Sequence, residues 1–211
     1  MKIAIIGAGK VGVALGRRWA GTGNEVVFGV RDPGNARTQT AAAGAEVIVL
    51  AVPWDAVAGA VAAAGDLSAK VLIDCTNPVG PGYTLALTGA LSAAELVAQW
   101  APGARVVKAF NTLGTGMLGD LADLNPRLPN PVATFVCGDD PAAKATASDL
   151  GRQLGFAVVD AGPLSAAALL EPTALLWINL ADKQGLEPDF AFGLVRRPRE
   201  APNCPPQTAS W

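Results

Sequence analysis

The most restrictive feature of the sequence is a glycine pattern at its very start. An apolar run from Ile3 to Ile6 ends at Gly7, and further glycines follow at positions 9 and 12, in GAGKVG. A helix-compatible stretch comes next, and a second apolar run begins at Val26. In this order of strand, glycine turn, helix and strand, G-x-G-x-x-G predicts a turn that binds the pyrophosphate of a dinucleotide.

The three glycines are expected to have separate roles. Gly7 allows the tight turn out of the strand, Gly9 lets the backbone approach the pyrophosphate, and Gly12 permits close packing of the helix on the strand. The helix that starts near Lys10 would point free N–H groups and the positive end of its dipole at the phosphates. An ordinary strand-to-helix turn is the alternative, and the two flanking strand patterns favour the dinucleotide interpretation.

Composition excludes several classes of function. A chain of 211 residues with 51% hydrophobic and 16% charged residues can bury a core in one domain with a small appendage. Its net charge of -2 favours neither nucleic acid nor an anionic membrane as a partner. Histidine is absent, which excludes histidine triads, histidine general bases and histidine-ligated metals. No metal site is expected.

The cysteines and the apolar runs indicate a soluble protein of the cytoplasm. Cys75, Cys137 and Cys204 are widely spaced, form no C-x-x-C motif and are expected to be reduced thiols. The run 47–64 is interrupted by Pro53-Trp54-Asp55, so no transmembrane helix is predicted there.

Apolar strand patterns alternate with helical patterns along the chain, which predicts a Rossmann-like, doubly wound, mostly parallel α/β sheet. We expect an NADP-binding domain over residues 1–162 and a small C-terminal helical segment with a tail over 163–211. The expected strands are 3–6, 26–30, 47–52, 70–74, 105–110, 132–137 and 156–160, and the expected helices start at 10 and span 56–64, 92–100, 142–154 and 165–182.

The first half of this fold looks abbreviated. About fifteen residues separate the second strand from the run at Val47, whereas a helix, a third strand and a further helix would need roughly thirty. Either this half is short or residues are absent from the sequence. In both cases the carboxyl ends of the parallel strands should converge on one crevice, because ligands of such sheets bind there. The loops in question start at Gly7, Arg31, Pro53, Asn77 and Asn111.

The end of the second strand indicates which dinucleotide binds. NAD-binding folds place an acidic residue there for the ribose 2′-hydroxyl, and this sequence has Arg31 instead. A guanidinium matches a 2′-phosphate, so NADP(H) is favoured. Asp32 could serve NAD if the strand ran one or two residues further, although heading the turn Asp32-Pro33-Gly34 is its more ordinary role.

Motifs along nearly the whole chain, from Met1 to about Arg197, together resemble one family. They are GAGKVGVALGRRWA, FGVRD, LAVPWDAV, DCTNP, VVKAFNT, FVCGDD, GFAVVDAGPLSAA and DFAFGLVRR. In this order they are similar to the NADPH-dependent coenzyme F420 reductases and, more widely, to the cytosolic oxidoreductase domains of the STEAP metalloreductases. The resemblance implies hydride transfer between NADP(H) and a 5-deazaflavin (coenzyme F420) or flavin-like ring, in a cytoplasmic homodimer.

The resemblance also implies the residues of the site, carried over by position. The pyrophosphate would be held by the turn, the 2′-phosphate by Arg31, the nicotinamide-side ribose by the end of the third strand, and the nicotinamide by residues that follow the next two strands. The cofactor-binding residues are Gly7, Ala8, Gly9, Lys10, Val11, Gly12, Arg31, Ala51, Val52, Pro53, Asn77, Pro78 and Ala109, and the second substrate is bordered by Asn111, Leu113, Pro163 and Leu164.

The sequence departs from the family at two places. Relatives usually carry an arginine where this chain has Ala168, which bears on recognition of an anionic acceptor. The stretch after Arg31 is the second departure, because a helix and a strand are normally found there.

Two other functions stay open. One is an imine or carbonyl reductase of the pyrroline-5-carboxylate reductase type, for which Lys108 is the only serious proton donor; pairing at a strand end is the alternative role of Lys108. The other is a non-catalytic NADP-binding sensor module. Transfer between two rings needs no protein acid or base, so no catalytic residue is assigned.

Overall fold

The computed structural model describes residues 1–30, 36–87, 89–124, 131–188 and 190–195. Its strands are β1 (Lys2–Ile6), β2 (Glu25–Gly29), β3 (Val47–Leu50), β4 (Val71–Asp74), β5 (Val79–Gly80), β6 (Thr84–Leu85), β7 (Arg105–Ala109), β8 (Ala133–Gly138) and β9 (Ala157–Asp160). Its α-helices are α1 (Lys10–Gly21), α2 (Ala36–Gly44), α3 (Val57–Ala64), α4 (Ala93–Trp100), α5 (Thr115–Leu124), α6 (Pro141–Gln153) and α7 (Ala167–Asp182).

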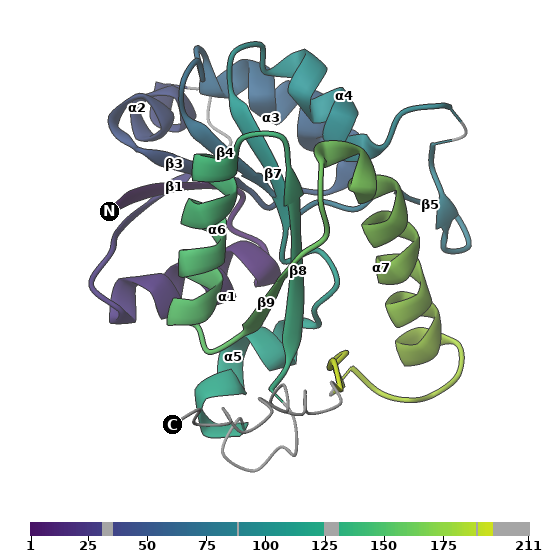
Figure 1. Cartoon of the computed structure of the whole chain (residues 1–211). Coiled ribbons are helices and arrows are strands. Elements are labelled where there is room, and N and C mark those ends of the chain that lie inside the picture. The colour runs from purple at the N-terminus through teal and green to yellow at the C-terminus, as the bar shows by residue number, and fades with distance from the viewer. Residues whose placement is uncertain (31–35, 88, 125–130, 189, 196–211) are drawn as a thin grey trace, which may run out of the picture.

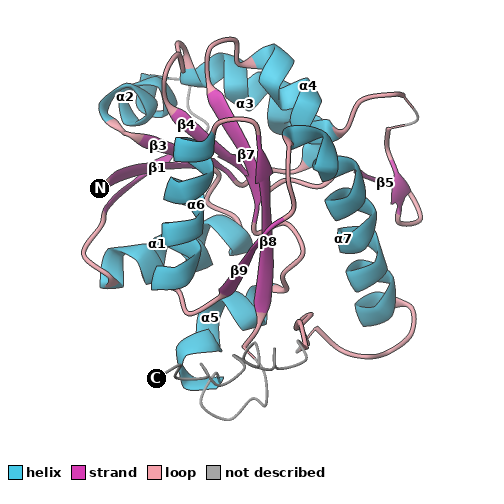
Figure 2. Ribbon diagram, in the orientation of Figure 1, coloured by secondary structure: helices cyan, strands magenta, loops and turns pink. Residues whose placement is uncertain are grey.

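A single sheet forms the centre of the molecule, with helices on both faces (Figures 1 and 2). Its seven strands lie in the order β2-β1-β3-β4-β7-β8-β9. Helices α1, α5 and α6 pack on one face, and α2, α3, α4 and α7 contribute to the core on the other. This arrangement confirms the predicted doubly wound α/β fold. Within this sheet the neighbouring strands β2, β1, β3, β4 and β7 are parallel to one another. Strand β8 pairs antiparallel with β7, and β9 is parallel to β8.

The first half of the sheet is short, as the sequence indicates. After β2 the chain passes through α2 and enters β3 on the opposite side of β1, so β2 is the edge strand of the described sheet. The sequence patterns predict no helix between the second strand and the third, and this is wrong, because α2 occupies residues 36–44. Thr38 holds this helix on the sheet: its side chain is 3% exposed and its hydroxyl donates to the Val30 carbonyl at 3.1 Å.

Two further elements were not expected from the sequence. The β5–β6 hairpin follows the Asn77-Pro78 loop, and helix α5 follows β7. The hairpin is tied to the end of α7, because the Tyr83 hydroxyl donates to Asp182 Oδ2 at 2.6 Å and Lys183 Nζ donates to the Gly82 carbonyl at 3.0 Å.

Helix α1 is fixed by contacts with a distant part of the chain. Trp19 is fully buried, and its indole N–H donates to the Leu150 carbonyl in α6 at 3.1 Å. The neighbouring Arg18 donates from Nη2 to the Leu154 carbonyl at 3.0 Å. The helix that begins at the glycine turn is therefore held in place by α6.

Helix α7 is apolar and partly uncovered. Its inner side carries Leu170 and Ala174, which are buried, whereas Leu169 and Leu176 are 71% and 51% exposed. The segment Leu164–Asp182 is long and apolar enough to cross a membrane by length and composition, a test that core helices of soluble proteins also pass. In this fold it packs against α4, and Glu171 at its centre is only 3% exposed.

Candidate functional site

The carboxyl ends of four parallel strands lie side by side. Pairing in register places Ile6 of β1 beside Leu50 of β3, Leu50 beside Asp74 of β4, and Asp74 beside Lys108 of β7. The loops that leave these strands therefore start along one edge of the sheet. A ligand-binding crevice is predicted at this edge from the sequence, because ligands of such sheets bind at the carboxyl ends of the strands.

The glycine turn has the geometry that its pattern predicts. Gly7 adopts φ +114°, and a Cβ there would overlap the carbonyl oxygen of Ala51, so only glycine lets β1 turn this close to β3. A Cβ on Gly12 would overlap the carbonyl oxygen of Gly7. A Cβ on Gly9, in contrast, would meet nothing within 4 Å. The backbone at Gly9 thus faces open space.

The start of helix α1 can receive an anion there. Gly9 is the N-cap residue, no side chain caps the helix, and its first turn contains no acidic residue. The first N–H groups of a helix have no partner within the helix, and its dipole favours negative charge at this end. Open space at Gly9 together with this helix end fits a pyrophosphate.

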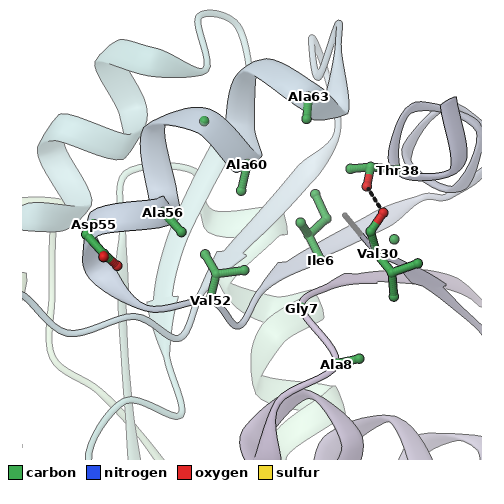
Figure 3. A pocket seen from close by; sticks show the side chains of 12 residues that line it. Ile6, Gly7, Ala8, Val30, Thr38, Val52, Asp55, Ala56, Ala60 and Ala63 are labelled. Atoms are coloured by element: carbon green, nitrogen blue, oxygen red, sulfur yellow. Dashed lines mark hydrogen bonds between the residues drawn. The ribbon is translucent and has the colours of Figure 1, made fainter. Parts of the chain in front are cut away.

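A cavity of about 600 Å³ adjoins the turn on the side of β2 (Figure 3). Its walls are the turn, the end of β2, helix α2, and the segment that leads from β3 into α3. Small side chains at helical spacing in that segment leave the room for it, and Thr38 and Asp55 add polar groups. The lining residues are Ile6, Gly7, Ala8, Gly29, Val30, Thr38, Val52, Asp55, Ala56, Gly59, Ala60 and Ala63.

The position and lining of this cavity fit the adenosine end of a dinucleotide. It is mostly apolar and starts at the pyrophosphate turn, as a nucleoside site of this fold does. Val30 lines it, and Arg31 is the next residue in the chain. Arg31 itself, like Asp32, lies outside the described residues.

A second depression lies on the other side of the turn, between α1 and the start of α5. It has a volume of about 830 Å³ and brings Lys10, Arg17 and Arg18 together with Thr115 and Gly116. Lys10 and Arg17 are exposed. The predicted cofactor residue Lys10 thus lines this depression and not the cavity.

The two asparagines singled out from the sequence contact each other. Asn77 Nδ2 donates to the Asn111 carbonyl at 2.8 Å, and Asn111 Nδ2 donates to Asn77 Oδ1 at 3.0 Å and to the Leu170 carbonyl at 3.1 Å. Asn111 is 6% exposed, and its Oδ1 has no hydrogen-bond partner among the described residues. The preceding Phe110 has φ +60°, an uncommon backbone conformation that sets the direction of Asn111.

A buried ionic network lies directly behind this pair. Lys108 Nζ donates to Asp74 Oδ2 at 2.9 Å and to the Thr76 carbonyl at 2.6 Å, and lies 3.3 Å from Glu171 Oε1. The side chains of Lys108 and Asp74 are fully buried, and that of Glu171 is 4% exposed. Of the two roles suggested for Lys108 from the sequence, the structure thus shows the ion pairing at a strand end.

The charges of this network stabilise each other. Burial alone would lower the pKa of Lys108, but the adjacent carboxylates of Asp74 and Glu171 outweigh it and hold that pKa above its ordinary value. Glu171 also accepts the backbone N–H groups of Ala93 and Ala94 at 3.0 and 3.2 Å, at the start of α4. Its charge is therefore met by both an ammonium and a helix N-terminus.

The remaining predicted site residues have varied surroundings. Val52 lines the cavity, while Ala51 donates its N–H to the Ile6 carbonyl at 2.9 Å. Pro53 precedes a short 3₁₀ turn at Trp54–Ala56. Of the six others, four are buried, and two are half-buried or exposed. Buried are Pro78, Ala109, Leu113 and Leu164; Val11 is half-buried, and Pro163 is exposed.

Sequence reasoning missed part of this site. The position of Thr38 in the cavity wall cannot be predicted without helix α2, which the sequence patterns do not indicate. The small face of residues 56, 59, 60 and 63 has a readable signal, since small side chains at positions i, i+3, i+4 and i+7 of a helix leave a hollow. Asp74 was counted only as the end of a strand, and its pairing with Lys108 depends on the neighbouring strand.

The described residues contain no group of metal-binding side chains. Cys75 and Cys137 are buried free thiols, and Cys204 lies outside the described residues. Burial raises the pKa of the Cys137 thiol to about 12, so it stays protonated at neutral pH.

Comparison with known proteins identifies relatives over most of the chain. The family model for coenzyme F420-dependent NADP oxidoreductases matches residues 2–78. The F420-dependent NADP reductase of Methanothermobacter thermautotrophicus is 31% identical over 211 aligned residues, which cover 85% of this chain and 89% of that protein. The metalloreductase STEAP3 of Rattus norvegicus is 31% identical over 82% of this chain, but this covers only 36% of STEAP3.

Solved structures agree with these relatives. A crystal structure assigned as an F420-dependent NADP reductase from Arthrobacter sp. FB24 is 32% identical, with a TM-score of 0.82, and covers 93% of this chain and 100% of its own. The NADP-bound pyrroline carboxylate reductase of Plasmodium falciparum is 16% identical, with a TM-score of 0.54, over 88% of this chain and 70% of its own. At that identity the likeness concerns the fold alone.

Proposed function

This chain belongs to the family of coenzyme F420-dependent NADP oxidoreductases and is an NADP-dependent oxidoreductase, and we propose that it transfers a hydride between NADP(H) and a deazaflavin (coenzyme F420) or flavin-like acceptor. The family follows from relatives that match over 85% of the chain. The match to STEAP3 covers only about a third of that protein, so it does not indicate the acceptor. The choice of acceptor is therefore argued from the residues of the site.

The binding roles follow the edge of the sheet. We assign the pyrophosphate to the turn Gly7–Gly12, the adenosine to the cavity beside it, and the 2′-phosphate to Arg31. The nicotinamide is assigned to the region of Asn77, Pro78 and Ala109, and the second ring to the region of Asn111, Leu113, Pro163 and Leu164. The open backbone at Gly9 supports the pyrophosphate end of this assignment, and the half-buried Asn77 supports its nicotinamide end.

The observation that carries the choice of acceptor is the confinement of Lys108. Reduction of a carbonyl or imine uses a proton donor such as Lys, His or Tyr in the crevice. Lys108 is fully buried and bound to two acceptors at 2.6 and 2.9 Å. Histidine is absent, and the hydroxyl of the single tyrosine, Tyr83, donates a hydrogen bond to Asp182.

A ring acceptor removes the need for such a donor. NADPH supplies the hydride when bound, and the receiving ring takes it at carbon or nitrogen without a protein acid. The residues of this chain then have to place two rings face to face and exclude water from them. The carbonyl or imine reductase alternative needs a donor, and Lys108, the donor that the sequence suggests for it, is enclosed in its ionic network.

The test is oxidation of NADPH by the purified protein, followed spectroscopically with coenzyme F420, with a flavin, and with cyclic imines and ketones. Turnover with a ring acceptor and none with imines or ketones is expected. Turnover with an imine would establish the alternative reductase. Tight NADPH binding without transfer to any acceptor would establish the sensor module instead.

We also propose that the protein is a homodimer. The outer side of α7 presents Leu169 and Leu176, and Trp100 of the adjoining α4 is 38% exposed. Exposed large apolar side chains on a helix are typical of a subunit interface. The buried free thiols of Cys75 and Cys137 suit the reducing cytoplasm, which we propose as its compartment.

A further inference from the structure

Three charged side chains, Lys108, Asp74 and Glu171, form a network in the interior of the fold. Taking three charged groups out of water is unfavourable, and buried ionic groups of this kind are often no more stabilising than apolar side chains of similar size. Lys108 and Asp74 could be replaced by such side chains, since the other buried residues of β4 and β7 are apolar. Its presence calls for a role other than stability.

Lys108 and Asp74 both bind the residue that precedes Asn77. Lys108 Nζ holds the Thr76 carbonyl at 2.6 Å, and Thr76 directly precedes Asn77. Asp74 holds the same turn from its other side, accepting the Thr76 N–H at 2.8 Å and its hydroxyl at 2.7 Å. The β4 loop therefore has its last residue before Asn77 fixed at three atoms.

The other asparagine is fixed from α7. Glu171 is bound to Lys108 and to the start of α4, and its neighbour Leu170 accepts from Asn111 Nδ2 at 3.1 Å. Lys108 itself lies three residues before Asn111 on the same strand end. One ammonium thus connects the three chain segments, from β4, β7 and α7, that surround the pair.

We propose that Lys108, Asp74 and Glu171 are positioning residues, which hold the Asn77–Asn111 pair in the one arrangement that receives the reacting end of the dinucleotide. This rests on the proposed function, because it places the nicotinamide at Asn77 and the second ring at Asn111. Asn77 is the half-buried member of the pair, and its contacts with Asn111 use one N–H of its amide and one lone pair of its Oδ1. Its second N–H and second lone pair match a primary carboxamide, which supplies both N–H donors and an acceptor.

A double-mutant cycle between Lys108→Met and Asn77→Ala tests this. Each single variant is expected to lower kcat for NADPH oxidation at least tenfold and to weaken NADPH binding, because a displacement of about 1 Å can cost that much or more. The double variant should be no worse than the poorer single variant, since both changes disturb the same placement. Binding of 2′,5′-ADP, which contains only the adenosine end, should change less than about twofold.

The matched control is Lys70→Met. Lys70 lies just before β4, at the opposite end of the sheet, and donates to the carbonyls of Ala43 and Ala45 at 3.1 and 2.7 Å. It is expected to lower the melting temperature without changing kcat. Should Lys108→Met not fold, Glu171→Gln keeps the shape and removes one charge, and the same cycle is run with it.

Three results would overturn the inference. One is multiplicative loss in the double variant, which means that lysine and asparagine act independently. Another is an equal loss of 2′,5′-ADP and NADPH binding, which means that the whole domain is perturbed. The third is unchanged kcat and NADPH affinity in Lys108→Met. A wild-type protein without turnover would refute the proposed acceptor alone, because the cycle can then be read from NADPH affinity.

Discussion

Changing two glycines of the same turn to alanine is expected to affect different properties, stability at Gly12 and cofactor binding at Gly9. At Gly12 the added methyl would overlap the carbonyl oxygen of Gly7 and lie 3.1 Å from Ile5 Cγ2. At Gly9 it would meet nothing within 4 Å, and the backbone there is extended with φ -76°. The first change thus affects the fold, and the second affects what binds to it.

The magnitudes follow from these surroundings. Overpacking costs up to about 3 kcal/mol, and a backbone oxygen cannot move aside as a side chain can. Higher helix propensity returns about 1 kcal/mol, so Gly12→Ala should lose about 2 kcal/mol net. For a domain of this size that is a fall of about 4–8 °C in the melting temperature of the free protein.

For Gly9→Ala the free protein should be nearly unaffected. Reduced freedom of the unfolded chain stabilises by about 0.4–1 kcal/mol, and a poorer N-cap costs a similar amount. A methyl group in the path of the pyrophosphate removes a hydrogen bond to a charged group, worth about 1.5–3 kcal/mol. NADPH affinity should therefore fall about 10-fold to 150-fold.

Thermal unfolding without cofactor and calorimetric titration with NADPH measure the two effects. Gly21→Ala is the matched control, because Gly21 lies in the same helix and an added Cβ there meets nothing within 4 Å. It should unfold at the wild-type temperature or slightly above. The steric reasoning fails if Gly12→Ala behaves as this control does, or if Gly9→Ala destabilises the free protein as much as Gly12→Ala.

Three further outcomes are expected. Arg31→Ala should weaken NADPH binding about tenfold or more and leave NADH binding unchanged, since a charge-assisted contact to the 2′-phosphate is lost; an unaltered preference in titrations with both cofactors would contradict the assignment. Leu169→Glu combined with Leu176→Glu should convert the proposed dimer to a monomer in sedimentation experiments, and a monomeric wild type would refute the dimer. Because the pKa of Cys137 is raised from 9.0 to about 12 in the fold, its contribution to stability is complete below pH 9 and is lost as pH rises toward 12; denaturant unfolding of Cys137→Ala should show a smaller alkaline loss than the wild type.

The parts of the fold that the sequence predicted are those with local signals. Strands such as residues 47–50 are continuous apolar runs, and the glycine turn has its own spacing, so the sequence predicts both, together with a mostly parallel sheet. Helix α2 was missed because ARTQTAAAG has no apolar stripe. Only tertiary contacts, such as that of Thr38 with Val30, show where it packs.

In the candidate site, too, single residues could be predicted from local sequence, whereas their contacts could not. Asn77 and Asn111 could be singled out because each follows a buried strand, and their mutual hydrogen bonds depend on β4 and β7 being neighbours. The pairing of Lys108 with Asp74 is a cross-strand contact in register, and Glu171 arrives from a helix 63 residues later in the chain. The reversed direction of β8 likewise has no local signal in its sequence.

The anchoring of helix α1 has a consequence for the order in which the chain folds. The indole of Trp19 finds its acceptor at Leu150, and Arg18 finds its own at Leu154, both more than 130 residues further along. During synthesis the glycine turn leaves the ribosome early, but the contacts that seat its helix form only after α6 has emerged. A nascent chain that stops before α6 is therefore expected to contain the entire G-x-G-x-x-G motif and still lack a seated phosphate-binding helix.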